Sequence, residues 1–502
     1  MLVLLGVTCV GFGFAQAPSQ TTATAETRNA GELLKKLDLL IEQNARLEEQ
    51  NRALMEQIQS LRKGVADQAG LKADRPQQDT SNLVSPTPIA ELPDKTEEIE
   101  EKTEPKRWGN YTPNFGYKVV DTERGDMSIS IYTYARYLNQ RALDDTFTDA
   151  FGNIKKIQQR QDFQLNKVQI KFLGWVMSPK FRYFLYGWTN NATQGLPAQV
   201  VLAGNLNYSF NDHLTLSAGI TALPGTRSVE GNFPFWLGVD ARMIADEFFR
   251  PSYTSGIWAK GQISKKLRYQ AMVGNNLSTL GVSAAQLDKG FNTFAGALVW
   301  TPTTGEFGPG FGDFEDHQEL ATRLAVHFTR SNEDKQSQPN SESFENTQLR
   351  LSDGSIIFNP NLFGPGVTVT DARYRMSTAD GGMKYHGLAL EGEYFWRWLD
   401  DFKGTGTATV PDLFDHGFQM QLSAMVVPKT LQLYAGHSRI FGQFGHPYDA
   451  RFGGNWFPWK NKVIRWNTEV LYLSRSPVGY TAVPFPAGGN GFVFHSTLEL
   501  AF

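Results

Sequence analysis

The chain has 502 residues, and its 48 Lys and Arg residues nearly balance its 51 Asp and Glu residues. This balance argues against a nucleic-acid partner, because nucleic-acid-binding domains concentrate basic residues. No uninterrupted apolar run approaches the roughly 20 residues that a membrane-spanning helix needs, which excludes a helical membrane protein. The length fits either several soluble domains or one large closed β-barrel.

Residues 1–15 are apolar and predict a secretory signal peptide. Small residues stand at Gly13 and Ala15, so that cleavage would fall before Gln16. Cys9 is the only cysteine, and it would leave with this segment; a lipid anchor on Cys9 is the alternative. A mature chain without cysteine has no disulfide, no thiolate metal site and no thiolate nucleophile.

Residues 30–63 carry a heptad repeat that predicts an α-helical coiled coil. The seam leucines recur every seven residues and are Leu33, Leu40, Leu47, Leu54 and Leu61. The second seam position mixes apolar residues with Asn44 and Asn51, and a buried Asn fixes the register of a coil at some cost in stability. A single amphipathic surface helix is the alternative, which about four heptads in strict phase disfavour. We therefore expect an oligomer.

Residues 64–107 combine scattered prolines with an acidic run and predict a linker. The acidic run extends from Asp94 to Glu104. Such a composition buries little apolar surface, so we expect an extended, mostly disordered tether.

The last segment, residues 491–502, shows the pattern that organises the rest of the chain. Phe492 and Phe494 fall on one side of an extended strand, and His495 and Glu499 fall on the other, because successive side chains alternate. In a membrane barrel the outward face meets lipid and the inward face meets water, so the alternation is a requirement of the two solvents. An edge strand of a soluble β-sandwich is the alternative.

Similar alternation recurs throughout residues 108–502, and we expect an all-β transmembrane barrel of about 16 antiparallel strands. The expected strands are 127–138, 163–174, 181–190, 200–210, 214–222, 256–264, 267–275, 290–301, 319–330, 367–378, 387–398, 417–427, 431–439, 449–458, 463–474 and 491–502. Short and long connections alternate between them, which the two equivalent ends of a soluble sandwich would not require. The connection 302–317 is the exception, and we interpret it as a glycine-rich insertion. The strand 367–378 is the least clearly marked, so about fourteen or eighteen strands are the alternatives.

Basic residues on the expected inner faces and in the third long connection, residues 223–254, are the candidates for selecting solutes. The pore-lining and constriction candidates are Arg136, Lys167, Lys171, Arg182, Arg227, Arg242, Arg250 and Arg323. A ring of one sign selects ions of the other sign, but Glu391, Glu393, Glu469 and Glu499 are expected on the same inner faces. Ordinary solvated wall residues are therefore the alternative for each candidate.

Several stretches resemble the phosphate-selective porin O and P family of outer-membrane porins. They are residues 116–125, 162–174, 387–394 and the closing strand. The resemblance covers roughly residues 108–502 and implies a trimeric channel of sixteen strands, in which basic residues of the wall and of an inward-folded third loop guide anions. It carries these roles to Lys167 and Arg227. The family's basic pair appears here as Asn166-Lys167, and its Lys-x-Pro-Phe-Gly stretch appears as Leu223-Pro-Gly-Thr-Arg227.

The sequence therefore predicts a porin of the bacterial outer membrane, surrounded by lipid, with its coiled coil in the periplasm. Small hydrophilic solutes or anions would diffuse through it without a cofactor or metal. The coil would clamp a homo-oligomer or reach towards the cell wall; the resemblance implies a trimer, whereas seam Asn residues are better known from two-stranded coils. A barrel-anchored adhesin or envelope-tethering protein that uses the coil is the alternative. No familiar nucleophile motif suggests an enzyme. Asp313, Glu315 and Asp316 form an acidic cluster that is a candidate for holding a cation.

Overall fold

The computed structural model describes residues 111–112, 115–189, 191–192, 200–230, 235–277, 290–335, 349–479 and 482–502. The chain divides into two compact units, Met1–Leu83 and Val84–Phe502, and every described residue belongs to the second. The predicted signal peptide, coiled coil and linker lie outside the described residues. Within the described part of the chain, no helix has the length and apolarity to cross a membrane.

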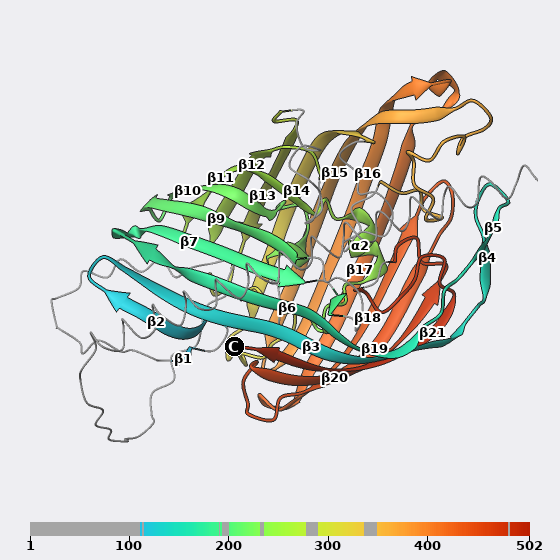
Figure 1. The fold of residues 1–502 in the computed structure, drawn as a ribbon. Coiled ribbons are helices and arrows are strands. Elements are labelled where there is room, and N and C mark those ends of the chain that lie inside the picture. The colour runs from blue at the N-terminus through green and yellow to red at the C-terminus, as the bar shows by residue number, and fades with distance from the viewer. Residues whose placement is uncertain are drawn as a thin grey trace, which may run out of the picture. The chain divides into compact units, whose positions relative to one another are not determined.

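Sixteen antiparallel strands among the described residues form a closed barrel (Figure 1). They are β3 (Gly125–Leu143), β6 (Gln161–Val176), β7 (Ser178–Thr189), β9 (Val200–Asn211), β10 (Leu214–Ala222), β11 (Tyr253–Ser264), β12 (Leu267–Gly274), β13 (Thr293–Trp300), β14 (Ala321–Asp334), β15 (Thr368–Tyr385), β16 (Leu388–Thr405), β17 (Leu413–Val427), β18 (Leu431–Phe441), β19 (Tyr448–Trp456), β20 (Ile464–Ser474) and β21 (Gly491–Ala501). Each pairs with the next in this order, and β21 closes the ring on β3. The predicted barrel of sixteen strands is confirmed, and the alternatives of fourteen and eighteen strands are wrong.

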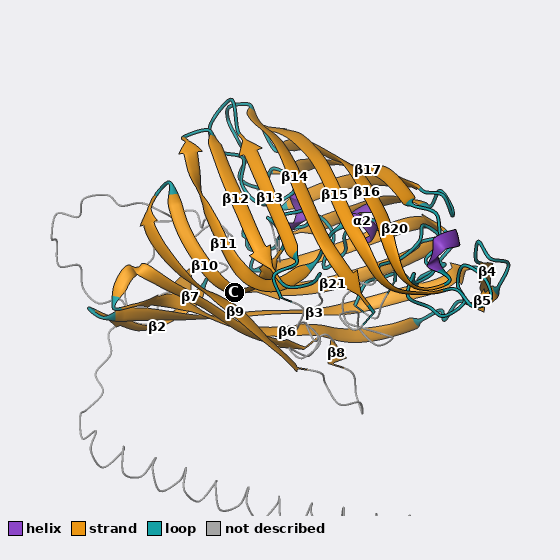
Figure 2. Cartoon of the chain, turned by 90° about the horizontal axis from the view of Figure 1, so that it is seen from above, coloured by secondary structure: helices purple, strands orange, loops and turns teal. Residues whose placement is uncertain are grey.

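The remaining elements are short and lie outside this ring of pairings or inside the barrel. They are β1 (Tyr111–Thr112), β2 (Gly116–Thr122), β4 (Thr146–Thr148), β5 (Ile154–Lys156), β8 (Asn191–Ala192), the 3-10 turns η1 (Arg227–Val229) and η3 (Thr407–Thr409), and the helix α2 (Ile244–Phe249). Both ribbon views place α2 within the ring of strands (Figures 1 and 2). All six residues of α2 are buried, so this helix belongs to the interior.

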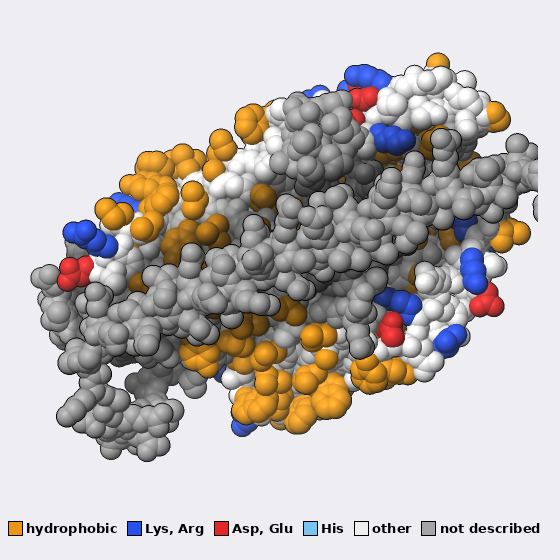
Figure 3. Space-filling view, in the orientation of Figure 1, with side chains coloured by type: hydrophobic (Ala, Val, Ile, Leu, Met, Phe, Trp, Pro, Cys, Tyr) orange, Lys and Arg blue, Asp and Glu red, His pale blue; other side chains and the backbone are white. Residues whose placement is uncertain are grey.

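Side chains alternate between a buried inner face and an apolar outer face on the barrel strands. On β21, Val493 and His495 are at most 1% exposed, whereas Phe492 is 55% exposed. The outer positions of the other strands are also rich in exposed Leu, Val, Ile and Phe, and Figure 3 shows hydrophobic side chains gathered on the described part of this surface. An apolar exterior over a polar interior inverts the usual pattern of a soluble protein.

The connections are sorted by length between the two ends of the barrel. Six tight turns share one end, here called the short-turn end, and they follow β6, β9, β11, β15, β17 and β19. The connection between β13 and β14, residues 301–320, lies at the same end and is the exception that the sequence predicts. The strands β15 and β16 run seven residues beyond the predicted ends at 378 and 398, because Gly381 and Gly382 in one and the polar residues after Leu399 in the other hide the alternation.

Candidate functional site

The third long link, residues 223–252 between β10 and β11, lies inside the barrel. Its described residues, 223–230 and 235–252, are almost all buried. Val239 accepts a hydrogen bond from Arg136 on β3, and the carbonyl of Phe249 accepts one from Tyr374 on β15. The link therefore reaches walls that are far apart around the ring, and it does not lie on the rim.

Wall arginines hold the irregular backbone of this link. A buried carbonyl needs a donor, and a segment without regular secondary structure cannot supply one itself. Arg465 donates to the carbonyl of Trp236 at 2.6 Å, Arg451 to that of Arg242 at 2.7 Å, and Arg136 to that of Val239 at 2.9 Å. These guanidinium groups act as structural donors, which gives Arg136 a role other than lining an open path.

Acidic partners neutralise the three predicted basic residues of the link. Arg227 pairs with Glu391 on β16 at 2.8 Å, while Arg242 and Arg250 both pair with Glu247 on α2, at 3.0 and 2.9 Å. Burial alone would raise the pKa of Glu247, but Arg250 and Arg242 outweigh burial and lower that pKa. The Glu247 carboxylate is therefore held in its ionised form, and each of the three arginines has an acidic partner in the interior.

Arg323 on β14 belongs to a second buried network. Its Nε donates to Asp380 at 2.6 Å, and its Nη2 donates to Glu230 of the link at 2.8 Å. Glu230 also pairs with Arg268 on β12 at 2.7 Å. Burial would raise the pKa of Glu230, but Arg268 and Arg323 lower it below its ordinary range. Arg323 thus ties the link to the wall.

His327, Asp380 and Glu393 place possible metal-ligand atoms within 4.8 Å of one another. The two ring nitrogens of His327 already lie 3.0 Å from the carbonyl of Pro224 and 2.7 Å from Asp380, and Asp380 also pairs with Arg323. His327 and Asp380 contact each other. Glu393 accepts hydrogen bonds from the amide of Arg227 and from Gln419, so these groups have protein partners and do not indicate a metal centre.

The acidic residues that the sequence suggests as a cation site also have protein partners. Asp313 pairs with His317, and Glu315 pairs with Lys462 at 2.9 Å. These two carboxylates have different basic partners, and the cluster does not converge on a common cation.

A β-bulge explains why both Asn166 and Lys167 face the lumen. The register between β3 and β6 shifts at this point, and Lys167 has a φ of 48°. The Nζ of Lys167 lies 2.6 Å from Asp240 at the inner end of the link, and Tyr134 donates to the same carboxylate. Lys167 therefore fixes the link, as Arg136 and Arg323 do.

Lys171 and Arg182 differ from the other candidates because neither contacts the described residues of the third long link. Lys171, on the inner face of β6, lies 5.9 Å from the ring centre of Tyr132, and no carboxylate within the described ranges forms an ion pair with it. Arg182 on β7 is partly exposed and donates to the carbonyl of Pro179 at 3.0 Å. Of these two, Arg182 is partly exposed, whereas Lys171 is buried at 5% exposure.

Charge is segregated around the wall, which the sequence reasoning did not anticipate. The strands β7 and β9–β13 contain no Asp or Glu, and their charged residues are Lys180, Arg182, Lys260 and Arg268. The opposite strands carry buried inner carboxylates, namely Glu333, Asp380, Glu391, Glu393, Asp415, Asp449, Glu469 and Glu499. The expectation that both signs line the same inner faces holds for these opposite strands, where Arg397 lies on the same buried face of β16 as Glu391 and Glu393, but it fails on β7 and β9–β13. Counting Asp and Glu for each predicted strand would have revealed this.

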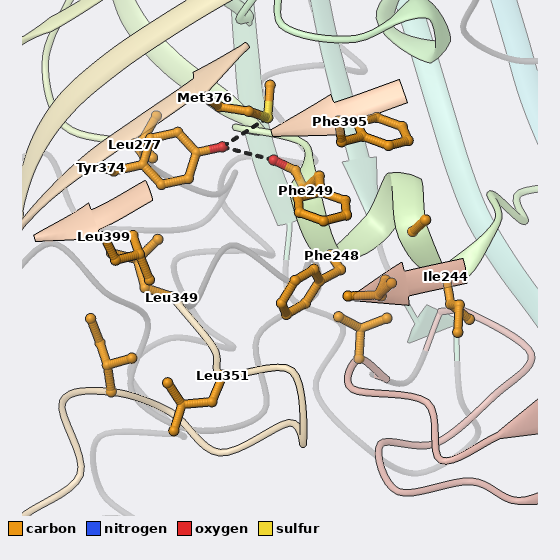
Figure 4. Packing of buried hydrophobic residues seen from close by; sticks show 14 of the residues in the cluster. Ile244, Phe248, Phe249, Leu277, Leu349, Leu351, Tyr374, Met376, Phe395 and Leu399 are labelled. Atoms are coloured by element: carbon orange, nitrogen blue, oxygen red, sulfur yellow. Dashed lines mark hydrogen bonds between the residues drawn. The ribbon is translucent and has the colours of Figure 1, made fainter. Parts of the chain in front are cut away.

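Apolar packing completes the attachment of the link. Figure 4 shows Phe248 and Phe249 of α2 among Tyr374, Phe395 and Leu399, with Leu349 and Leu351 beside them. The ring of Phe249 stacks on that of Phe395 at 5.0 Å between centres. Two aromatic side chains at the end of a six-residue helix thus anchor the link to the wall by apolar packing.

No protein-family model and no curated protein matches the chain. Among solved structures it is similar to OmpT expressed in the outer membrane of Vibrio cholerae, with 9% identity and a TM-score of 0.47 over 76% of this chain and 99% of that one. It is also similar to the outer membrane channel DcaP of Acinetobacter baumannii, with 9% identity and a TM-score of 0.45 over 77% and 99% of the two chains. A third is an anion-selective porin from Comamonas acidovorans, with 10% identity and a TM-score of 0.44 over 75% and 100%.

Proposed function

We propose that this chain forms a channel in the bacterial outer membrane through which small hydrophilic solutes diffuse passively, with a preference for anions. One observation carries the channel: sixteen strands close a ring that is apolar outside and polar inside. A ring of this size encloses space beyond what its own wall side chains fill, so the inward-folded link narrows a lumen instead of completing a core. Passive diffusion requires no cofactor.

The preference for anions rests on the segregation of charge. The strands β7 and β9–β13 offer basic residues and no carboxylate of their own, with Arg268 paired to Glu230 of the third long link, while most acids on the other half are buried against arginines. A solute that passes along the basic wall therefore meets a positive potential, which raises the local concentration of anions. Phosphate, which the resemblance implies, is one anion that such a wall would accept.

The eight candidate residues then fall into two groups. Arg182 belongs to the basic half of the lumen and is partly exposed, so it acts on the solute directly, whereas Lys171 is buried on the neighbouring strand β6 and contributes its charge from within the wall. Arg136, Lys167, Arg323 and the arginines of the third long link position that link and so set the width of the channel. Substitutions in the first group change selectivity, and those in the second change conductance.

Single-channel currents in planar bilayers test both parts of this proposal. We expect discrete current steps, and a reversal potential in a KCl gradient of the sign that chloride permeation produces. The double variant Lys171→Gln with Arg182→Gln lowers the anion-to-cation permeability ratio, roughly twofold or more, because it removes two wall charges. Arg439→Gln is the matched control, since Arg439 faces outward on β18.

The outcomes separate the channel from its selectivity. Block of the current by added phosphate would extend the preference to that anion. Steps without ion preference would refute the selectivity and leave a general channel, and folded protein that gives no steps would refute the channel itself.

A further inference from the structure

The exceptional connection at the short-turn end, residues 301–320, crosses the barrel. It is called the crossing segment below. Near its start, the carbonyl of Pro302 accepts a hydrogen bond from Lys266 in the turn after β11 at 2.7 Å; near its end, Glu315 pairs with Lys462 in the turn after β19 at 2.9 Å. Eight of the sixteen strands separate these two turns, so they face each other across the ring.

The middle of the crossing segment is buried in the interior. Phe307 is 1% exposed and Phe311 is 8% exposed. Lys384 on β15 donates to the carbonyl of Gly310 at 2.7 Å and lies 4.6 Å from the ring centre of Phe307. A connection that merely capped the turns would leave these aromatic rings in water, so the segment is built to lie inside.

The crossing segment meets the third long link, which enters from the opposite end. The amide of Phe311 donates to the carbonyl of Phe235 at 2.8 Å. Arg227 donates to the carbonyls of Pro309 and Gly310 at 2.8 and 3.1 Å, and its guanidinium lies 4.7 Å from the ring centre of Phe311. Two segments from opposite ends of the barrel are therefore joined at one arginine.

Glu391 makes this junction specific. One of its oxygens accepts from Arg227 at 2.8 Å, and the other accepts from the amide of Gly312 at 3.2 Å. A single wall carboxylate thus binds both the third long link and the crossing segment. Because charge-assisted hydrogen bonds are directional, Glu391 fixes the position of the two segments relative to each other and also stabilises them.

We propose that the crossing segment is a second constriction, and that Arg227 is the positioning residue that joins it to the third long link. The size limit of the channel is then set from both ends. This inference rests on the proposed channel function, because a constriction has meaning only where a solute passes. The inference gives a function to the long connection at the end where the other turns are short.

The direct test replaces residues 303–318 with a two-residue Asn-Gly turn, which has the length of the turns after β9, β11 and β15. We expect the single-channel conductance to rise roughly twofold or more and larger sugars to enter liposomes in a swelling assay, because the obstruction is removed. The control shortens residues 406–411, which are mostly exposed at the other end of the barrel. Heat-modifiable migration in gels establishes that both variants are folded.

A second pair of variants guards against a folding defect in the replacement. Arg227→Gln combined with Glu391→Gln removes the junction without leaving a buried charge, and it should raise conductance and increase current noise. Arg227→Lys keeps the charge but loses the forked donor, so it should fall between this variant and the natural chain. Unchanged conductance and an unchanged sugar limit in the folded replacement would overturn the second constriction while leaving the channel intact. A natural chain without current steps would instead overturn the channel.

Discussion

At the scale of single residues, the interior depends on buried arginines that serve two partners at once. Arg465 pairs with Glu499 at 2.6 Å and donates to the carbonyl of Trp236 at the same distance. Removing one member of such a pair leaves the other charge buried without a partner, and this typically costs more than the interaction itself contributes.

Arg465→Gln should therefore lower the free energy of unfolding by about 3 kcal/mol, measured by denaturant unfolding in detergent. Arg465→Gln with Glu499→Gln should lose less, because no charge is stranded. Arg439→Gln, on the exposed outer face, is the control with little expected effect. Equal losses in the single and the double variant would contradict this account.

His317 gives the crossing segment a dependence on pH. Hydrogen bonds to Asp313 and Glu306 raise the pKa of His317 from 6.5 to about 9. A raised pKa means that the folded state holds the proton more tightly, so the stabilisation is complete below pH 6.5 and is lost as the pH rises through about 9. Hydrogen exchange of residues 301–320 should therefore be faster at high pH than the intrinsic chemical acceleration predicts. In His317→Gln the extra acceleration of exchange at high pH should disappear. If it persisted, the pH dependence would belong to another group.

At the scale of elements, the crossing segment depends on glycine at a tight position. Gly312 has a φ of 78°, and an added Cβ would meet Nε2 of Gln432, with Oγ of Ser423 at 2.9 Å. Gly366 has a φ of 80° and open space around its Cβ position. Both Gly→Ala changes carry the backbone penalty of about 1–2 kcal/mol, but only Gly312→Ala adds a clash. Denaturant unfolding should show the lower free energy of unfolding for Gly312→Ala. Equal losses of stability in the two variants would show that the neighbouring side chains move aside without cost.

The strands were largely predictable from the sequence, because lipid outside and water inside impose a period of two on each. The segment around Phe492 and His495 shows this directly, and the β15–β16 hairpin was underestimated where Gly381 and Gly382, and the polar residues after Leu399, interrupt the pattern. The contacts of the interior were not predictable. Arg227 and Glu391 are 164 positions apart, and no local period marks one as the partner of the other. The sequence identifies the basic candidates by their residue type and by the strand face on which they lie. Which of them hold the third long link depends on the irregular path of that link.

At the scale of the whole molecule, the heptad repeat of residues 30–63 predicts an oligomer clamp, a trimer if the resemblance holds. Deleting these residues should reduce the mass of the detergent-solubilised particle from that of a trimer to that of a monomer, because the seam leucines no longer associate. Light scattering measures this, and the conductance of each pore should stay the same. An unchanged mass would assign the association to the barrels and free the coil for contact with the cell wall.

The closing seam between β21 and β3 also has a consequence for how the molecule is assembled. Arg136 and Tyr134 on β3 hold Val239 and Asp240 of the third long link, and Glu499 on β21 holds Arg465, which in turn binds Trp236. The last strands to meet can satisfy their buried groups only if the link is already within the ring. We therefore expect closure of the ring and insertion of the third long link to occur cooperatively. Pulsed proteolysis during refolding should find β21 and the link becoming protected together.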